Sequence, residues 1–269
     1  MSRFEILCTT MHQNGFSKIE EMNIRSDVVF ANQCDHTSYE EKEFDGHTAK
    51  MISTRTRGVG INRNLTLLYA QGDICLFADD DVTYNDDVEK TVLSEFDAHP
   101  DADVMIFHLD TTSDRKDISY PKTKKCRGFY RMPWGAYRIA FRHGSVKKAN
   151  LWFTTLFGGG CKFPCGEDTL WLSDARKKGL TFYVSEKTIG TVSHKESTWF
   201  TGYDKKYYFG QGAMYQALRP KSFYLWLCYS VWRTRGEKQL SVSEKIKWIK
   251  LGREGYRKMR SYQECLEEQ

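Results

Sequence analysis

The strongest indication of the fold is the segment Gly72-Asp73-Ile74-Cys75-Leu76-Phe77-Ala78-Asp79-Asp80-Asp81-Val82. Its middle, residues 74–78, is almost continuously apolar, which is typical of a central parallel strand covered on both faces. Three aspartates follow directly, and their mutual repulsion is costly unless a cation neutralises it. Because open α/β sheets bind ligands at the carboxyl ends of strands, the pattern predicts a Mg²⁺ or Mn²⁺ site for a diphosphate. The alternative is an aspartate-rich turn that caps the next helix.

Short apolar runs alternate with helical patterns on both sides of this stretch. Strands are expected at residues 4–10, 27–32 and 104–107, and helices at 18–24, 61–71 and 86–96. Farther along, a helix is expected from Gly166 to Lys178, where Gly179 ends it, and a strand at 180–184. Strands that alternate with helices predict βαβ units, and hence a parallel sheet with right-handed crossovers.

Length and composition exclude several classes of protein. The chain has 269 residues, of which 40% are hydrophobic and 28% charged, which excludes intrinsic disorder. The mean hydropathy of −0.60 excludes an integral membrane protein. The first residues contain no long apolar segment before a cleavage site, so we expect a cytoplasmic protein whose eight scattered cysteines are reduced. Cys161 and Cys165 form the only close pair, and two further zinc ligands at suitable spacing are missing.

Positive charge is concentrated near the C-terminus, where residues 205–260 carry 14 basic and three acidic side chains. Residues 222–232 form an uncharged, aromatic stretch that is too short to span a bilayer. A capping-box pattern at Ser241 predicts a helix with Val242, Ile246 and Ile249 on one face. The tail therefore indicates either peripheral contact with an anionic membrane or packing against the rest of the chain.

A second acidic group, Glu167-Asp168, follows Gly166 at the start of the expected helix. A glycine-rich loop precedes this group, Trp171 follows, and His194 comes 26 residues after Asp168. The acids could merely favour the positive end of the helix dipole. With a histidine as third ligand beside carboxylates, they could also belong to a metal site.

A third group, Arg55 to Asn64, has two glycines and several arginines at the start of a helix. Helix N-termini and arginines bind anions, so this segment is a plausible phosphate cradle. Its spacing matches neither the dinucleotide fingerprint nor the P-loop.

Taken in order, these motifs resemble the family-2 glycosyltransferases of GT-A fold. The resemblance rests on a glycine followed by Asn62-Arg63-Asn64, on Gly72-Asp73-Ile74 with the three aspartates, and on Gly166-Glu167-Asp168-Thr169 with a downstream histidine. It covers roughly residues 4–200. The resemblance implies a mixed, mainly parallel sheet flanked by helices, with residues 1–204 as the GT-A catalytic domain. Residues 205–269 would then form a basic amphipathic helical extension.

The resemblance also implies roles for individual residues. Asp168 matches the general base, Asp81 and His194 the metal ligands, and Glu167 and Trp171 lie on the acceptor side. The residues that match the nucleotide-sugar site are Thr9, Thr10, Asn32, Arg57, Asn62, Arg63, Asp79 and Asp80. One departure from the family concerns the contact with the base of the nucleotide. Many members have an acidic residue after the second strand, where this chain has Asn32-Gln33.

The implied activity is metal-dependent inverting transfer of a sugar from a nucleotide-sugar donor, with UDP as the expected nucleotide. The expected acceptor is a saccharide or lipid-linked saccharide in bacterial surface polysaccharide synthesis, at the inner face of the cell membrane. The expected cofactor is Mn²⁺ or Mg²⁺, and nucleic acid is not an expected partner.

Two other interpretations remain. Asp79-x-Asp81-x-Thr83 after an apolar strand also resembles the nucleophile motif of haloacid-dehalogenase-like phosphatases, although that motif normally ends the first strand of its core. A non-enzymatic module that binds polyanions through the basic tail is the other alternative, although the tail contains no recognisable nucleic-acid-binding module.

Overall fold

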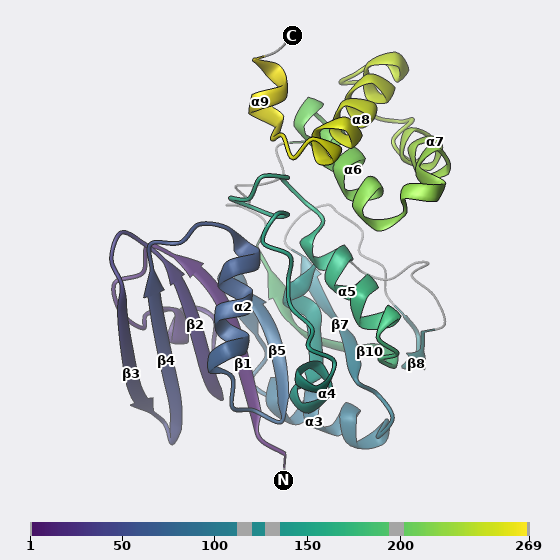
Figure 1. Cartoon of the computed structure of the whole chain (residues 1–269). Coiled ribbons are helices and arrows are strands. Elements are labelled where there is room, and N and C mark those ends of the chain that lie inside the picture. Colours follow the sequence, from purple (N-terminus) through teal and green to yellow (C-terminus); the bar gives the residue numbers. More distant parts are fainter. Residues whose placement is uncertain (1, 112–119, 127–134, 194–201, 268–269) are drawn as a thin grey trace. The chain divides into compact units, whose positions relative to one another are not determined.

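The computed structural model describes residues 2–111, 120–126, 135–193 and 202–267 (Figure 1). The chain divides into two compact units, which we call the sheet unit and the helical unit. The sheet unit comprises Met1–Arg57, Ile61–Trp152 and Asp174–Glu196. The helical unit comprises Gly58–Gly60, Phe153–Ser173 and Ser197–Gln269. Residues 153–173 thus group with the C-terminal helices, although they lie within the segment that the sequence assigns to the catalytic domain.

The sheet unit contains a ten-stranded sheet with the order β3-β4-β2-β1-β5-β9-β7-β10-β6, in which β8 pairs with β10. The strands are β1 (Phe4–Met11), β2 (Asp27–Gln33), β3 (Ser38–Phe44), β4 (His47–Thr54), β5 (Ile74–Asp79), β6 (Val82–Tyr84), β7 (Val104–Thr111), β8 (Lys124–Lys125), β9 (Ile139–Arg142) and β10 (Phe182–Val192). The neighbours β4, β2, β1 and β5 are parallel, whereas β9 runs antiparallel between β5 and β7. The carboxyl ends of four strands therefore meet at one edge.

Helices cover both faces of this sheet. The helices α1 (Lys18–Glu21) and α3 (Val88–Ala98) bury Ile19, Val92 and Phe96 in a core shared with apolar side chains of the sheet. The helices α2 (Val59–Tyr69) and α4 (His143–Lys148) lie on the opposite face (Figure 1). The expected α/β fold, a sheet flanked by helices with helices at the C-terminus, is confirmed.

The helical unit packs α6 (Lys205–Leu218), α7 (Phe223–Arg233), α8 (Val242–Arg257) and α9 (Tyr262–Leu266). Residues 156–163 supply Phe157 and Phe163 to the same core, against Phe209 and Trp248. Apolar side chains of α6 and α8 thus share one core with an aromatic loop that lies far away in the sequence. Within the described part of the chain, no helix is long and apolar enough to cross a membrane.

The helices α6 and α8 meet through two glycines. A Cβ atom on Gly212 of α6 would overlap the backbone of Ile249, and a Cβ atom on Gly252 of α8 would overlap the backbone of Phe209. Only glycine allows the two backbones to approach so closely. This contact sets which face of α8 is buried.

The helix α8 begins at its capping box as predicted, and two of the three apolar residues expected on one of its faces pack in the core. The Ser241 and Glu244 side chains each bind the other residue's backbone N–H. Ile249 is buried, whereas Val242 is 57% exposed. Lys245 is buried instead, because its ammonium donates to the carbonyls of Thr234 and Glu237 at 2.7 Å. Ile246 packs against the same core, so Val242 in the first turn is the residue of that apolar face that is exposed.

The outer hairpin of β3 and β4 has no counterpart in the sequence prediction. The β3 segment, Ser38-Tyr39-Glu40-Glu41-Lys42-Glu43-Phe44, is exposed and charged, as an edge strand can be. Its pairing with β4 satisfies the backbone hydrogen-bonding groups on one side of β3, so this strand can form without a run of apolar residues. The first predicted helix is also shorter than expected: α1 ends at Glu21, and Asn23 adopts the left-handed φ of 51°.

Candidate active site

The predicted acidic stretch lies at the carboxyl end of β5, beside the end of β1. Thr9 of β1 is in register with Asp79 of β5. The hydroxyl of Thr9 donates to Asp79 Oδ1 at 3.1 Å, and the hydroxyl of Thr10 donates to Asp80 Oδ2. Two predicted threonines therefore hold two of the predicted aspartates in place.

Arg63 on α2 reaches the same aspartate from the helix side. Its Nη2 donates to Asp79 Oδ1 at 2.9 Å, and the Arg63 side chain is only 4% exposed. Lys18, which sequence analysis did not single out, donates from Nζ to the backbone carbonyl of Asp80 at 3.3 Å. A lysine at the start of a short helix gave no signal, because its proximity depends on the crossover between β1 and β2.

Asp81 differs from its two neighbours in its surroundings. Its Oδ1 is buried and has no hydrogen-bond partner among the residues that the structure describes. Burial, together with the negative charges of Asp79 and Asp80, raises the pKa of Asp81 to about 7. A divalent cation would supply the missing partner and favour the ionised form, so the residues present fit the predicted metal.

The two predicted asparagines are fully buried and hold the strand ends together. Asn32 Nδ2 donates to the carbonyl of Gln13 and to Ser53 Oγ, each at 3.0 Å. Asn62 Nδ2 donates to the carbonyls of Thr10 at 3.3 Å and Ala31 at 2.9 Å. These bonds connect the start of α2 with β1 and β2, so both asparagines shape the rim of the site.

Arg57 lies in the loop before α2. Its Nη1 donates to the carbonyls of Cys34 at 2.9 Å, Thr56 at 3.0 Å and Arg55 at 3.1 Å. The guanidinium thus stabilises the loop conformation of the predicted anion cradle, and a direct contact between Arg57 and the donor stays a prediction.

The remaining predicted residues belong to the helical unit or lie outside the described residues. Glu167 and Asp168 begin α5 (Glu167–Lys177), and Asp168 Oδ1 accepts the backbone N–H of Thr169 at 2.6 Å. Gly158 has φ of +106°, and a Cβ atom there would lie 2.9 Å from the Glu167 carboxyl group. The glycine-rich loop therefore leaves room for this acid. His194 lies outside the described residues, so its role stays a prediction.

Trp171 is buried rather than available at the surface. Its side chain is 1% exposed and stacks on Phe153 with ring centroids 5.5 Å apart. An acceptor-side role for this ring stays a prediction, and its packing shows that it also holds α5 against residue 153.

The eight cysteines are free thiols, and burial raises the pKa of Cys165 to about 12, with Glu167 and Asp168 adding to the shift. In the part of the chain that the structure describes, one group of three potential ligands lies within 4.8 Å, namely Cys34, Asp35 and His36. These side chains already hydrogen-bond one another, with 3.1 Å between His36 Nδ1 and Asp35 Oδ1.

Comparison with known proteins finds a family match within the chain. Residues 26–147 match the family model described as Glycosyl transferase family 2. This segment contains β2, β5, Arg63 and all three aspartates. None of the curated proteins matches the chain significantly.

Several solved structures share the fold. The crystal structure of S. aureus TarS 1-349 in complex with UDP-GlcNAc has a TM-score of 0.61 and 14% identity, over 97% of this chain and 93% of that chain. The complex of the same TarS fragment with UDP has a TM-score of 0.57 and 14% identity, over 97% of this chain and 93% of that chain. The longer TarS structure has a TM-score of 0.55 and 16% identity, over 90% of this chain and 41% of that chain. The family match over residues 26–147 and the shared GT-A fold indicate a glycosyltransferase.

Proposed function

We propose that this glycosyltransferase transfers a sugar from a UDP-sugar to a saccharide or lipid-linked saccharide, with inversion at the anomeric carbon. The observation that carries the proposal is the pairing of Asp79 with Arg63 beside a buried, unpartnered oxygen of Asp81. The complexes of TarS with UDP-GlcNAc and with UDP support a uridine nucleotide. A role in bacterial surface polysaccharide synthesis in the cytoplasm is part of the same proposal.

In this proposal Asp81 would hold a Mn²⁺ or Mg²⁺ ion, with His194 as a further ligand. When bound, the cation would offset the negative charge on the departing diphosphate. Asp79 and Asp80 contact the donor's ribose or phosphates, and their positions are fixed by Thr9 and Thr10. Arg63 adds a permanent positive charge, and Asn32 and Asn62 shape the base pocket.

The chemical step needs a base for the acceptor hydroxyl. We assign this role to Asp168, whose carboxylate takes the hydroxyl proton as the acceptor oxygen attacks the anomeric carbon. The bond between that carbon and the diphosphate oxygen breaks, and the nucleoside diphosphate leaves with the electron pair. General-base catalysis of this kind contributes about 10²- to 10⁴-fold in rate. Glu167 and Trp171 lie in the same segment and belong to the acceptor side of the proposal.

The substitution Asp168→Asn tests the role of the base. We expect UDP binding within twofold of the wild type and sugar transfer reduced by at least 10²-fold. Asp174→Asn is the matched control, because Asp174 lies on the same helix and pairs with exposed Lys177 at 2.9 Å. Transfer by Asp168→Asn near the wild-type rate would remove the assignment.

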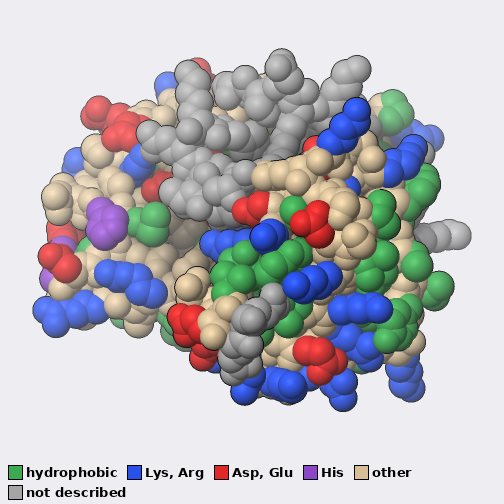
Figure 2. Space-filling model, turned by 90° about the horizontal axis from the view of Figure 1, so that it is seen from above, with side chains coloured by type: hydrophobic (Ala, Val, Ile, Leu, Met, Phe, Trp, Pro, Cys, Tyr) green, Lys and Arg blue, Asp and Glu red, His purple; other side chains and the backbone are tan. Residues whose placement is uncertain are grey.

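The helix α7 supports a second part of the proposal, contact with an anionic membrane. Its inner side chains Phe223 and Leu227 are buried in the helical unit, whereas its outer face exposes Tyr224, Leu225, Tyr229 and Trp232 by 44–74%. Hydrophobic side chains lie among lysines and arginines on the surface shown in Figure 2. A short helix with aromatic residues on one face and basic surroundings is typical of proteins that lie on anionic bilayers.

Co-sedimentation with vesicles tests the membrane contact. Deleting residues 222–269 would remove much of the core of the helical unit, so point substitutions are preferable. We expect Leu225→Ser with Trp232→Ser to reduce binding to phosphatidylglycerol vesicles at least tenfold. Val242→Ser, at an apolar residue of α8 that is 57% exposed, is the control. Equal binding of all variants, or equal binding to phosphatidylcholine vesicles, would contradict the proposal.

A further inference from the structure

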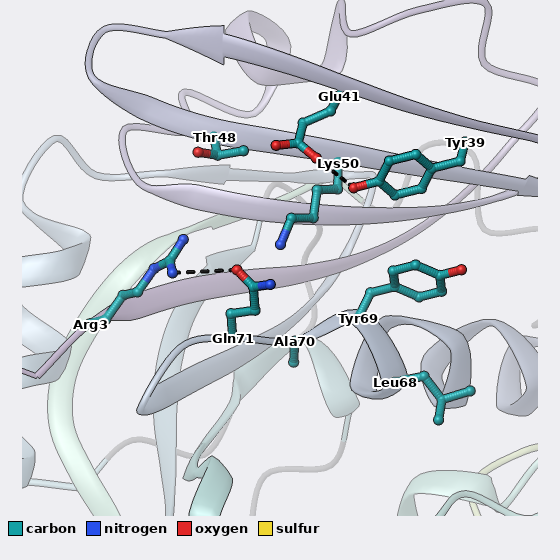
Figure 3. A pocket seen from close by; sticks show the side chains of 9 residues that line it. All are labelled: Arg3, Tyr39, Glu41, Thr48, Lys50, Leu68, Tyr69, Ala70 and Gln71. Atoms are coloured by element: carbon teal, nitrogen blue, oxygen red, sulfur yellow. Dashed lines mark hydrogen bonds between the residues drawn. The ribbon is translucent and has the colours of Figure 1, made fainter.

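The sheet unit contains a cavity of about 350 Å³ that lies away from the acidic site (Figure 3). It is formed by the β3–β4 hairpin, the residue before β1 and the C-terminal end of α2. Its lining residues are Arg3, Tyr39, Glu41, Thr48, Lys50, Leu68, Tyr69, Ala70 and Gln71. Arg3 precedes the first residue of β1, whereas Thr9 and Thr10 lie near the other end of that strand. The cavity is therefore separate from the acidic site, and its size is that of a small-ligand pocket.

Lys50 is the unusual residue of this cavity. Its side chain extends from β4 into the cavity, toward Gln71 (Figure 3), and the residue is only 7% exposed. Within the described ranges, its ammonium group has no hydrogen bond and no ion pair, unlike the buried Lys245 described above. This ammonium group still reaches the water of the cavity, and an anion bound in such a recess is attracted to it more strongly than at an open surface.

The neighbouring charges are already engaged with other groups. Glu41 lies directly opposite Lys50 in the β3–β4 register, but its carboxylate accepts the hydroxyl of Tyr39. This bond also raises the pKa of Tyr39. Arg3 pairs with Asp27 at 2.6 Å and donates to Gln71 at 3.4 Å. Lys50 is thus the lining cation that an incoming anion can bind without breaking a described ion pair.

One wall of the cavity is aromatic. Tyr39 and Tyr69 stack with ring centroids 5.8 Å apart and an interplanar angle of 26°. They remain 50% and 39% exposed, and Leu68 beside them is 66% exposed. Aromatic faces next to hydrogen-bonding side chains suit a ring that is apolar on its faces and polar at its edge, such as a pyranose.

We propose that this cavity binds a saccharide unit that carries an anionic group, either a carboxylate or a phosphate. The anionic group binds the ammonium of Lys50, and the sugar ring packs against Tyr39 and Tyr69. The ring hydroxyls bind the polar groups at the edge, namely those of Glu41, Thr48 and Gln71. This site goes beyond the proposed transfer reaction, because it lies at the other end of β1 and uses none of the residues assigned to the donor.

Ligand-observed NMR titrations with four probes test the chemistry: glucuronate, glucose 6-phosphate, glucose and inorganic phosphate. They are run with saturating UDP and Mn²⁺, so that the donor site is occupied. We expect glucuronate or glucose 6-phosphate to bind at least tenfold more tightly than glucose and inorganic phosphate. Equal binding of glucose would overturn the role of the anion, and equal binding of inorganic phosphate would overturn the role of the ring.

Variants locate the binding in the cavity. We expect Lys50→Met to weaken binding of the better acidic sugar at least tenfold, and Tyr69→Ala at least threefold. Lys42→Met is the matched control, since Lys42 lies on β3 and is exposed. Lys50→Arg should retain binding, which separates loss of charge from loss of folding. Unchanged binding in both Lys50→Met and Tyr69→Ala would overturn the proposal. We expect Asp81→Asn to leave binding of the acidic sugar in this cavity intact. A failure of the proposed donor site can therefore be distinguished from a failure of the proposed cavity site.

Discussion

Arg63 and Asp79 form a largely buried ion pair that joins α2 to the carboxyl end of β5, with 2.9 Å between Nη2 and Oδ1. Thr9 donates to the same oxygen of Asp79 from β1. Three separate elements therefore converge on one carboxylate. This arrangement orients Asp79 before any ligand arrives, as an effective binding site requires.

The ion pair predicts a large effect of Arg63→Met. Removing the guanidinium leaves Asp79 partly buried without its cation, and we expect the free energy of unfolding to fall by about 3 kcal/mol. UDP binding should weaken as well, because a positive charge leaves the site. Urea denaturation and calorimetry measure the two effects.

Arg25→Met is the matched control for this substitution. Arg25 pairs with Asp86 on the surface, where both side chains are more than half exposed. We expect a change within about 0.5 kcal/mol, the usual range of surface pairs. Equal stability losses in the two variants would show that the buried pair has no special role.

The raised pKa of Asp81 predicts a pH dependence of stability in metal-free protein. The folded state holds the proton up to a pH of about 7, whereas the unfolded carboxyl has a pKa near 3.8. The stabilising contribution is fully present below the unfolded pKa and is lost as the pH rises through about 7. Unfolding in EDTA should therefore show wild type losing stability relative to Asp81→Asn between about pH 4 and pH 7.

Mn²⁺ should reverse this trend, because the cation binds the ionised carboxylate and displaces the proton. We expect the apparent affinity for Mn²⁺ to increase with pH up to about 7, and Asp86→Asn to behave like the wild type. Parallel stability profiles of wild type and Asp81→Asn across this pH range would contradict the assigned shift.

The glycine contact between α6 and α8 predicts that the helical unit is sensitive to a single methyl group. Gly212→Ala and Gly252→Ala each place a Cβ atom against the backbone of the facing helix, which cannot move aside as a side chain can. We expect each to reduce the free energy of unfolding by about 2–3 kcal/mol. Gly144→Ala in α4 is the control, because its Cβ atom would meet nothing within 4 Å. It should be neutral or stabilising by up to about 1 kcal/mol.

The parts of the fold that sequence analysis predicted are those with strong local signals. The apolar run of β5 and its three aspartates lie where the pattern placed them, and the capping box starts α8 at Ser241. The β3–β4 hairpin was missed because its outer strand is charged and exposed, so periodicity gave no indication. Val242 shares a face with Ile246 and Ile249 in the sequence pattern, but it lies in the first turn of α8 and is exposed, which apolar spacing alone does not reveal.

The site shows the same limit. Arg63 and Thr9 were predicted as donor-binding residues, but their shared contact with Asp79 depends on strand order and could not be deduced from spacing. Lys18 was missed for the same reason. The Lys50 cavity brings together residues before β1, on the hairpin and after α2, and these segments carry no common motif.

In the proposed site, Asp81 binds a cation that in turn binds a nucleoside diphosphate. Isothermal titration calorimetry of UDP with and without Mn²⁺ tests it most directly, with Asp86→Asn as the control. We predict that wild type binds UDP at least tenfold more tightly with Mn²⁺ than with EDTA, and that Asp81→Asn loses this difference. UDP affinity that is the same in EDTA, in Mn²⁺ and in Asp81→Asn would show that Asp81 holds no such cation.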